Sequence, residues 1–156
     1  MKTLHGEATV VVAAPIDECL ELLEAIDQYT AWYPEVIREV EVLERNPQGN
    51  PRMARATVHV ARGPLVRDLQ LVVAVTSDSG GTVKLLRLPN EPSDDETFEV
   101  TWRLTEADGT RIELRLHGYL DVPRLLPLGG IGDSMAQGLV AAATRALMAN
   151  RVDELE

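Results

Sequence analysis

The sequence predicts one α+β domain in which a curved antiparallel sheet of about seven strands wraps around a long C-terminal helix. Hydrophobic residues alternate with a period of two between residues 36 and 122, which is typical of half-buried strands. They recur at steps of three and four after a first strand and again from Ile131, which is typical of amphipathic helices. The connections between successive strands are short, so neighbouring strands are expected to pair as antiparallel hairpins.

An N-terminal strand is followed by two short helices. Residues Thr3–Ala13 are rich in β-branched side chains, and Pro15 followed by two acidic residues marks a helix start. The apolar residues of this helix share one face: Ile16, Cys19, Leu20, Leu23 and Ile26. Asp27 is expected to cap a second short helix, which Pro34 ends.

Six further strands and one long helix complete the chain. The strands are predicted at Val36–Arg45, Arg52–Arg62, Leu65–Thr76, Thr82–Leu88, Glu96–Thr105 and Thr110–Val122. Each has one apolar and one polar side, so the sheet should be covered on one face only. The helix that begins at Ile131 is the available cover, and long twisted strands should curl around it.

Composition and charge exclude several classes of protein. The 156 residues carry a formal net charge of −10, which disfavours binding to nucleic acid or to an anionic membrane surface. The single cysteine, Cys19, cannot form an intramolecular disulfide and favours a reducing compartment. We find no signal peptide, and the charge-poor stretch 125–143 contains Asp133 and four glycines. We therefore expect a cytoplasmic protein that does not insert stably into membranes.

The sequence contains no recognisable metal or cofactor motif. His5, His59 and His117 lack metal-ligand spacing. The glycine-rich stretch 129–133 lacks the lysine and hydroxyl residue of a phosphate-binding loop. We therefore predict no metal and no cofactor.

The order of the elements resembles that of the START-like, polyketide cyclase-related (SRPBCC) superfamily, which has the helix-grip fold. Three stretches carry the resemblance: Ala13-Ala14-Pro15-Ile16-Asp17-Glu18-Cys19, Tyr29-Thr30-Ala31-Trp32-Tyr33-Pro34, and Val100-Thr101-Trp102-Arg103-Leu104 with Asp108-Gly109-Thr110. It covers Thr3 to about Arg151, and so implies one START-like domain over residues 1–156. Members of this superfamily bind lipids, sterols, quinones, plant hormones or polyketides, and a minority are enzymes.

The small residues of the last helix predict a cavity. A sheet of six or seven strands spans more width than an alanine-rich helix can fill, so we expect an apolar ligand-binding cavity between them. Strand and helix periodicity predicts its lining: Leu69, Leu71, Phe98, Val100, Trp102, Leu114, Leu116, Met135 and Leu139. The aromatic residues Tyr29, Trp32 and Tyr33 are assigned to the core, with pocket lining as the alternative.

Three charged residues share the apolar side of their strands: Arg67, Arg87 and Glu96. A buried ion is costly unless it is paired or hydrated, so structural ion pairing and ligand contact are equal alternatives for them. The loops 62–65 and 89–95 occupy positions that resemble the gate and latch of hormone-binding members. We expect the three residues to cluster at the cavity mouth, where Glu96 neutralises one arginine and the other meets a ligand's polar or acidic head group.

These observations favour a protein that binds a hydrophobic or amphipathic small molecule, such as a lipid, quinone or polyketide, inside the cell. Transport of that molecule would be one use of such binding. The alternative is a polyketide aromatase/cyclase or dehydrase that uses the same cavity. An enzyme would need a general acid or base facing the cavity, and no inward His, Tyr or Asp is found deep along any strand. We assign no catalytic residue. An interaction module with a protein partner is a third hypothesis, and a homodimer stays open.

Overall fold

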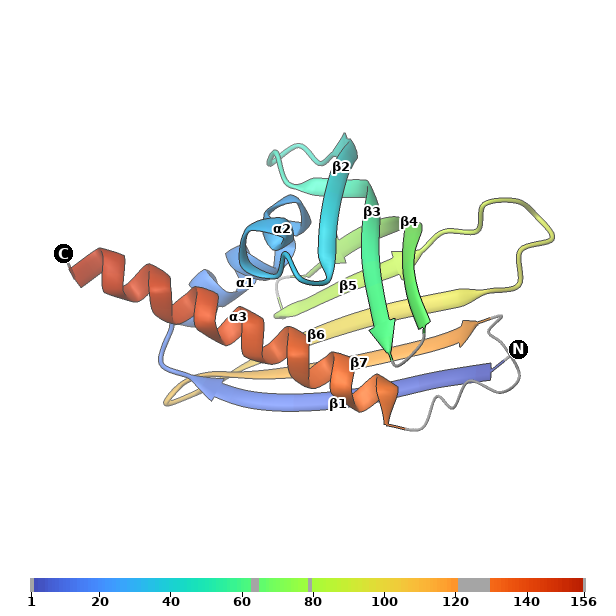
Figure 1. Cartoon of the computed structure of the whole chain (residues 1–156). Coiled ribbons are helices and arrows are strands. Elements are labelled where there is room, and N and C mark those ends of the chain that lie inside the picture. Colours follow the sequence, from blue (N-terminus) through green and yellow to red (C-terminus); the bar gives the residue numbers. More distant parts are fainter. Residues whose placement is uncertain (1, 63–64, 79, 121–129, 156) are drawn as a thin grey trace.

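The structure is a computed structural model that describes residues 2–62, 65–78, 80–120 and 130–155, and it has the expected α+β architecture (Figure 1). The chain begins with β1 (Lys2–Val12), α1 (Ile16–Glu24), the 3-10 turn η1 (Ile26–Gln28) and α2 (Tyr29–Trp32). Six strands follow: β2 (Ile37–Arg45), β3 (Pro51–Arg62), β4 (Leu65–Ser77), β5 (Thr82–Arg87), β6 (Thr97–Ala107) and β7 (Gly109–Leu120). The long helix α3 (Ile131–Leu155) comes last.

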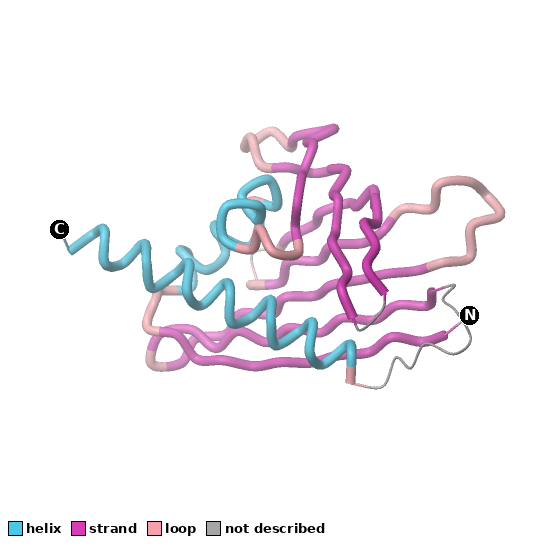
Figure 2. Tube along the Cα trace, viewed as in Figure 1, coloured by secondary structure: helices cyan, strands magenta, loops and turns pink. Residues whose placement is uncertain are grey.

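The strands form one antiparallel sheet in the order β1-β7-β6-β5-β4-β3-β2. Strands β2 to β7 are a meander, and β1 pairs with β7 along its whole length, from Lys2 opposite Leu120 to Val12 opposite Thr110. Figure 1 shows α3 running diagonally across one face of the sheet, while β2, β3 and β4 rise steeply beside it. Helices α1 and α2 lie on the same face as α3 (Figure 2). This is the helix-grip arrangement.

The one-sided burial of the sheet confirms the predicted alternation. In β7 the buried positions are Thr110, Ile112, Leu114, Leu116 and Gly118, and each residue between them is exposed or half-buried. The inner positions of β6 follow the same rule, with Val100, Trp102 and Leu104 buried. These side chains form one continuous hydrophobic core with residues of α1, η1 and α3.

Helix α3 begins in direct backbone contact with the edge strand β1. A Cβ atom on Gly132 would overlap the carbonyl of His5, and one on Gly6 would overlap the carbonyl of Gly132. The Oδ1 atom of Asp133 accepts a hydrogen bond from the backbone N–H of Glu7, at 3.1 Å. Two facing glycines therefore set the distance between helix and strand, and Asp133 satisfies a donor on the open edge of the sheet.

One local prediction is wrong. Asp27 lies inside η1, and neither η1 nor α2 has a side-chain cap hydrogen bond. The backbone of Gln28, before α2, is already helical, so there is no extended capping residue at that point. The carboxylate of Asp27 instead lies 3.5 Å from the guanidinium of Arg45. The predicted end of the last strand, at Val122, falls outside the described residues.

The glycine contact can be tested with Gly132→Ala. Alanine favours a helix by about 1 kcal/mol over glycine, but here its methyl group would push α3 away from β1. We expect a net loss of roughly 1–3 kcal/mol in the free energy of unfolding, the usual cost of overpacking. Urea denaturation measures it, with Gln137→Ala at an exposed position of α3 as the control. An unchanged or higher stability of Gly132→Ala would contradict the close contact.

Candidate ligand-binding site

An apolar cavity of about 80 Å³ lies between α3, the η1–α2 segment and the inner face of β2 to β6. All of its lining side chains are aliphatic or aromatic. They are Ile26, Tyr29, Val36, Ile37, Ala56, Val58, Leu71, Val73, Leu85, Phe98, Val100, Trp102, Met135 and Leu139. Three layers thus meet here: the sheet, the long helix and the short helical segment after β1.

The structure brings six of the residues predicted from the sequence into this cavity: Leu71, Phe98, Val100, Trp102, Met135 and Leu139. Leu114 and Leu116 are fully buried in the core of β7 and do not line it. Leu69 is half-buried and also lies outside the lining. The cavity is displaced from its expected position because the glycine contact holds α3 close to β1, and space remains on the side of β3 to β6.

Several lining residues were missed by the sequence analysis. Ala56 and Val58 alternate with the outward residues of β3, so the period of two could have placed them on the inner face. The sequence analysis assigned Tyr29 to the core and kept pocket lining as the alternative. In the structure Tyr29 lies on α2 and lines the cavity. Its ring lies 4.6 Å from that of Trp32, measured between centroids. No sequence signal shows that a short helical segment will turn an aromatic ring toward α3.

Two of the aromatic residues that line the cavity, Tyr29 and Trp102, also carry a buried polar atom. The hydroxyl of Tyr29 donates a hydrogen bond to the carbonyl of Leu23, at 2.6 Å, and burial raises the pKa of Tyr29. The Nε1 atom of Trp102 is buried and has no hydrogen-bond partner among the described residues. An unsatisfied buried donor of this kind costs about 1–3 kcal/mol.

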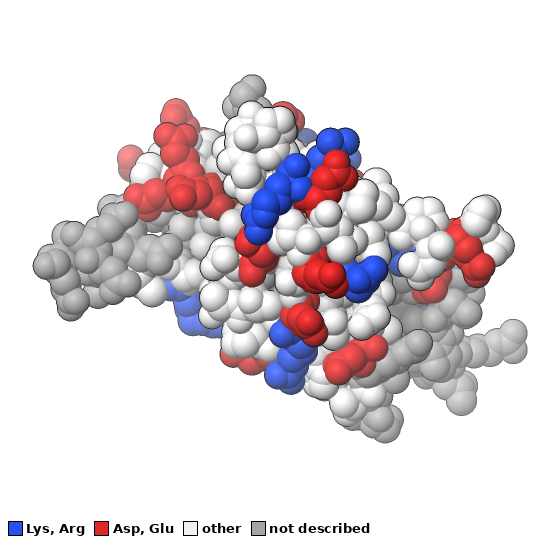
Figure 3. All heavy atoms as spheres, turned by 90° about the horizontal axis from the view of Figure 1, so that it is seen from above, with Lys and Arg blue, Asp and Glu red and all other residues white. Residues whose placement is uncertain are grey.

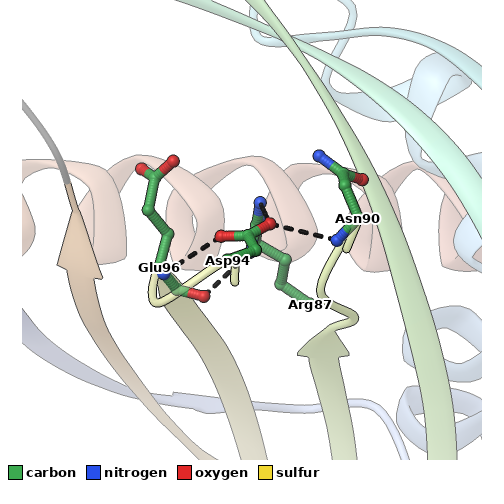
Figure 4. Close-up of polar contacts among 4 residues, drawn as sticks. All are labelled: Arg87, Asn90, Asp94 and Glu96. Atoms are coloured by element: carbon green, nitrogen blue, oxygen red, sulfur yellow. Dashed lines mark hydrogen bonds and ion pairs between the residues drawn. The ribbon is translucent and has the colours of Figure 1, made fainter. Parts of the chain in front are cut away.

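A charged network closes the loop between β5 and β6 (Figure 4). The guanidinium of Arg87 donates to the carbonyl of Glu96 at 2.8 Å and to the carboxylate of Asp94 at 2.7 Å. The same carboxylate accepts hydrogen bonds from the backbone N–H groups of Asn90 and Glu96, at 3.0 and 3.1 Å. The side chains of Arg87 and Asp94 are only 6% and 10% exposed, so the pair is almost fully desolvated.

This network differs from the predicted cluster of Arg67, Arg87 and Glu96. Asp94, which the sequence analysis did not single out, neutralises Arg87, and the carboxylate of Glu96 points away from the guanidinium (Figure 4). Arg87 pairs with Val73 of β4, and Arg67 lies six residues earlier in that strand, about 20 Å away at 3.3 Å per residue. The backbone register therefore does not place Arg67 beside Arg87, and the side chain of Arg67 lies outside the described part of the structure.

Figure 3 shows charged side chains of both signs, with acidic ones gathered over the end of the molecule where α1 lies. Among residues 2–62, 65–78, 80–120 and 130–155, no group of three or more His, Cys, Asp or Glu side chains could hold a metal ion. No helix within these ranges is long and apolar enough to cross a membrane.

The sheet, the gripped helix and the apolar cavity between them define a START-like ligand-binding fold. The chain belongs to the family described as polyketide cyclase/dehydrase and lipid transport, whose sequence pattern matches residues 3–156. No curated protein is significantly similar to the chain in sequence.

Solved structures share the fold at low sequence identity. A START superfamily protein from Mycobacterium smegmatis is 18% identical, with a TM-score of 0.68 over 97% of this chain and 99% of that one. The di-domain ARO/CYC StfQ from the steffimycin biosynthetic pathway is 15% identical, with a TM-score of 0.65 over 97% of this chain and 52% of StfQ. The Zhui aromatase/cyclase from Streptomyces sp. R1128 is 20% identical, with a TM-score of 0.53 over 97% and 90%. At these identities the likeness shows the fold alone.

The Arg87–Asp94 pair should make the stability of the protein depend on pH. The Arg87 hydrogen bond and the backbone donors lower the pKa of Asp94 from 3.8 to about 2. Because the folded pKa is the lower one, the stabilisation is complete above pH 3.8 and is lost as the pH falls through 2. Asp94→Asn should therefore lower the unfolding temperature at pH 7, and the gap to the wild type should shrink below pH 4.

Thermal unfolding followed by circular dichroism between pH 7 and pH 2 measures this gap. Asp95→Asn, at the exposed neighbouring position, serves as the control for removing one negative charge from the same loop. A gap between Asp94→Asn and the wild type that stays constant down to pH 2 would show that the carboxylate charge does not stabilise the loop.

Proposed function

We propose that the protein binds a hydrophobic or amphipathic small molecule in the cavity between α3, α2 and the sheet. The observation that carries this proposal is the lining itself, in which aliphatic and aromatic side chains from α2, α3 and five strands converge on one cavity. Ligand sites in proteins are commonly apolar concavities with a small number of polar groups. A lipid, a quinone or a polyketide would fit this chemistry.

The size of the cavity sets a condition on binding. About 80 Å³ holds a few water molecules, whereas pockets for drug-sized ligands measure roughly 300–1,000 Å³. A ligand must therefore enlarge the cavity by displacing side chains. Met135 and Leu139 of α3 are half-buried lining residues, and the flexible methionine side chain repacks at low cost. We infer that these two side chains move when a ligand enters.

The lining favours binding over acid–base catalysis. Tyr29 is the single titratable side chain among the described lining residues. Its proton is donated to the Leu23 carbonyl and burial raises its pKa, so it is not a base at neutral pH. The StfQ and Zhui proteins are named as aromatase/cyclases. That activity is the alternative for this chain, and it would need a group outside the described lining.

The predicted role of Arg87 changes under this proposal. An acidic head group would have to displace Asp94 from the guanidinium, so we favour an uncharged ligand. Contacts of Arg67 and Glu96 with a ligand stay predictions. A cytoplasmic location, the absence of a nucleic-acid partner, a transport role and a homodimer also stay predictions.

A cavity-filling variant tests the proposal. Ala56 lines the cavity and is 5% exposed, so Ala56→Leu places three extra carbon atoms inside it. We expect the wild type to bind the neutral fluorescent probe N-phenyl-1-naphthylamine with saturable enhancement, and Ala56→Leu to weaken this binding at least tenfold. Titration by fluorescence gives both dissociation constants.

Ala61→Leu is the matched control, because it makes the same change in the same strand at an exposed position. Its affinity for the probe should equal that of the wild type. Leu139→Phe offers a second filling variant that leaves the sheet unaltered. Circular dichroism verifies that each variant is folded. Equal probe affinity in the wild type and in folded filling variants would refute binding in this cavity.

A further inference from the structure

We propose that the outer face of the sheet carries a second binding site, a groove that takes a small zwitterion. The ligand class is a molecule with an anionic oxygen group and an ammonium group joined by a short chain. The groove is lined by residues of β1, β5, β6 and β7, on the face of the sheet opposite to the apolar cavity. The proposal goes beyond the proposed function and does not depend on it.

Alternation along β6 places this outer groove directly behind the cavity. Val100 and Trp102 point inward and line the cavity, whereas Thr101 and Arg103 point outward and line the outer groove. The outer groove measures about 420 Å³, against about 80 Å³ for the cavity. It therefore has room for a small molecule without any displacement of side chains.

Charged side chains of both signs surround Thr101 in the outer groove. They are Lys84, Glu99, Arg103, Glu113 and Arg115. Lys84 of β5 and Arg115 of β7 lie opposite Thr101 on either side of it. The whole chain has 15 basic and 25 acidic residues, so a lining with more basic than acidic side chains departs from the composition of the molecule.

Two of the three cations are already engaged. The Nζ atom of Lys84 lies 3.1 Å from the carboxylate of Glu99, which also accepts a hydrogen bond from the hydroxyl of Thr101 at 3.3 Å. The Nε atom of Arg115 lies 3.5 Å from the carboxylate of Glu7. These contacts leave one cation and one anion of the lining to be accounted for.

Arg103 and Glu113 are an open charge pair. They lie opposite each other in the register of β6 and β7, yet neither side chain has an ion-pair or hydrogen-bond partner among the described residues. By contrast, Glu41 and Arg55 are opposed in the same way on β2 and β3, and their charged groups lie 2.9 Å apart. The outer groove thus presents a guanidinium and a carboxylate that do not neutralise each other directly.

A zwitterion matches this arrangement better than a simple ion does. An anionic oxygen group can accept two hydrogen bonds from the guanidinium of Arg103, and an ammonium group can pair with Glu113. An anion alone would also meet repulsion from Glu113, and a cation alone would meet repulsion from Arg103. The rings of His5 and His117, with centroids 6.3 Å apart, border the outer groove beside β1 and offer flat walls to the chain between the two charges.

The test uses the full chain labelled with ¹⁵N and three four-carbon probes: 4-aminobutyrate, which carries both charges at pH 7, butyrate and butylamine. Titrations followed in ¹H–¹⁵N spectra give the dissociation constants. We expect 4-aminobutyrate to bind at least fivefold more tightly than either of the other probes and to move the amide signals of Thr101, Arg103 and Glu113. Added salt should weaken this binding, because exposed charges are screened.

Variants identify the groups that bind. Arg103→Gln and Glu113→Gln should each weaken binding of 4-aminobutyrate at least fivefold. Arg111→Gln and Glu106→Gln are the matched controls, since they change exposed charges on the same two strands outside the groove lining, and they should leave the affinity unchanged. The double variant Arg103→Glu with Glu113→Arg keeps both charges and should bind within twofold of the wild type. Circular dichroism verifies that each variant is folded.

The results that would overturn the inference are specific. If butyrate binds as tightly as 4-aminobutyrate, or if Glu113→Gln binds 4-aminobutyrate more tightly than the wild type does, the outer groove is a simple anion site. If Arg111→Gln weakens binding as much as Arg103→Gln, or if no amide of the outer groove shifts with any probe, the zwitterion site does not exist. The cavity function is measured separately with N-phenyl-1-naphthylamine and stands or falls on that result.

Discussion

The close approach of Gly6 and Gly132 is the contact on which the rest of the structure depends. Because neither residue has a side chain, the start of α3 lies directly on the backbone of β1, and Asp133 bonds to the same strand. The helix is thereby fixed over β1 and β7, where Leu114 and Leu116 are fully buried. A helix held on that side cannot also fill the space above β3 to β6, since the curved sheet is wider than one helix.

The remaining space is closed by the segment between β1 and β2. Tyr29 from α2 and Ile26 from η1 complete the wall that Met135 and Leu139 of α3 begin. The hydrogen bond from Tyr29 to Leu23 ties this segment to α1, so the phenol is both a structural anchor and part of the wall. Side chains of this segment and of α3 therefore share the space that the sheet and the helix leave.

Charge is excluded from the cavity by pairing. The side chain of Arg87 leaves β5 on its inner face, and burying an unpaired ion there would cost free energy. Asp94 and the Glu96 carbonyl engage it, and the resulting network also orders the loop between β5 and β6. What the cavity wall presents is therefore hydrocarbon and aromatic rings.

The sequence by itself determined the class of fold, because the periods of two and of 3.6 record which side of each element is buried. It also identified Leu71, Phe98, Val100, Trp102, Met135 and Leu139, whose inward positions follow from that alternation. Tertiary structure decided where α3 lies, that Tyr29 faces the cavity, and that Asp94 neutralises Arg87. Those features depend on the distance between backbones and on the path of a loop, and a pattern of hydrophobicity along one chain contains neither quantity.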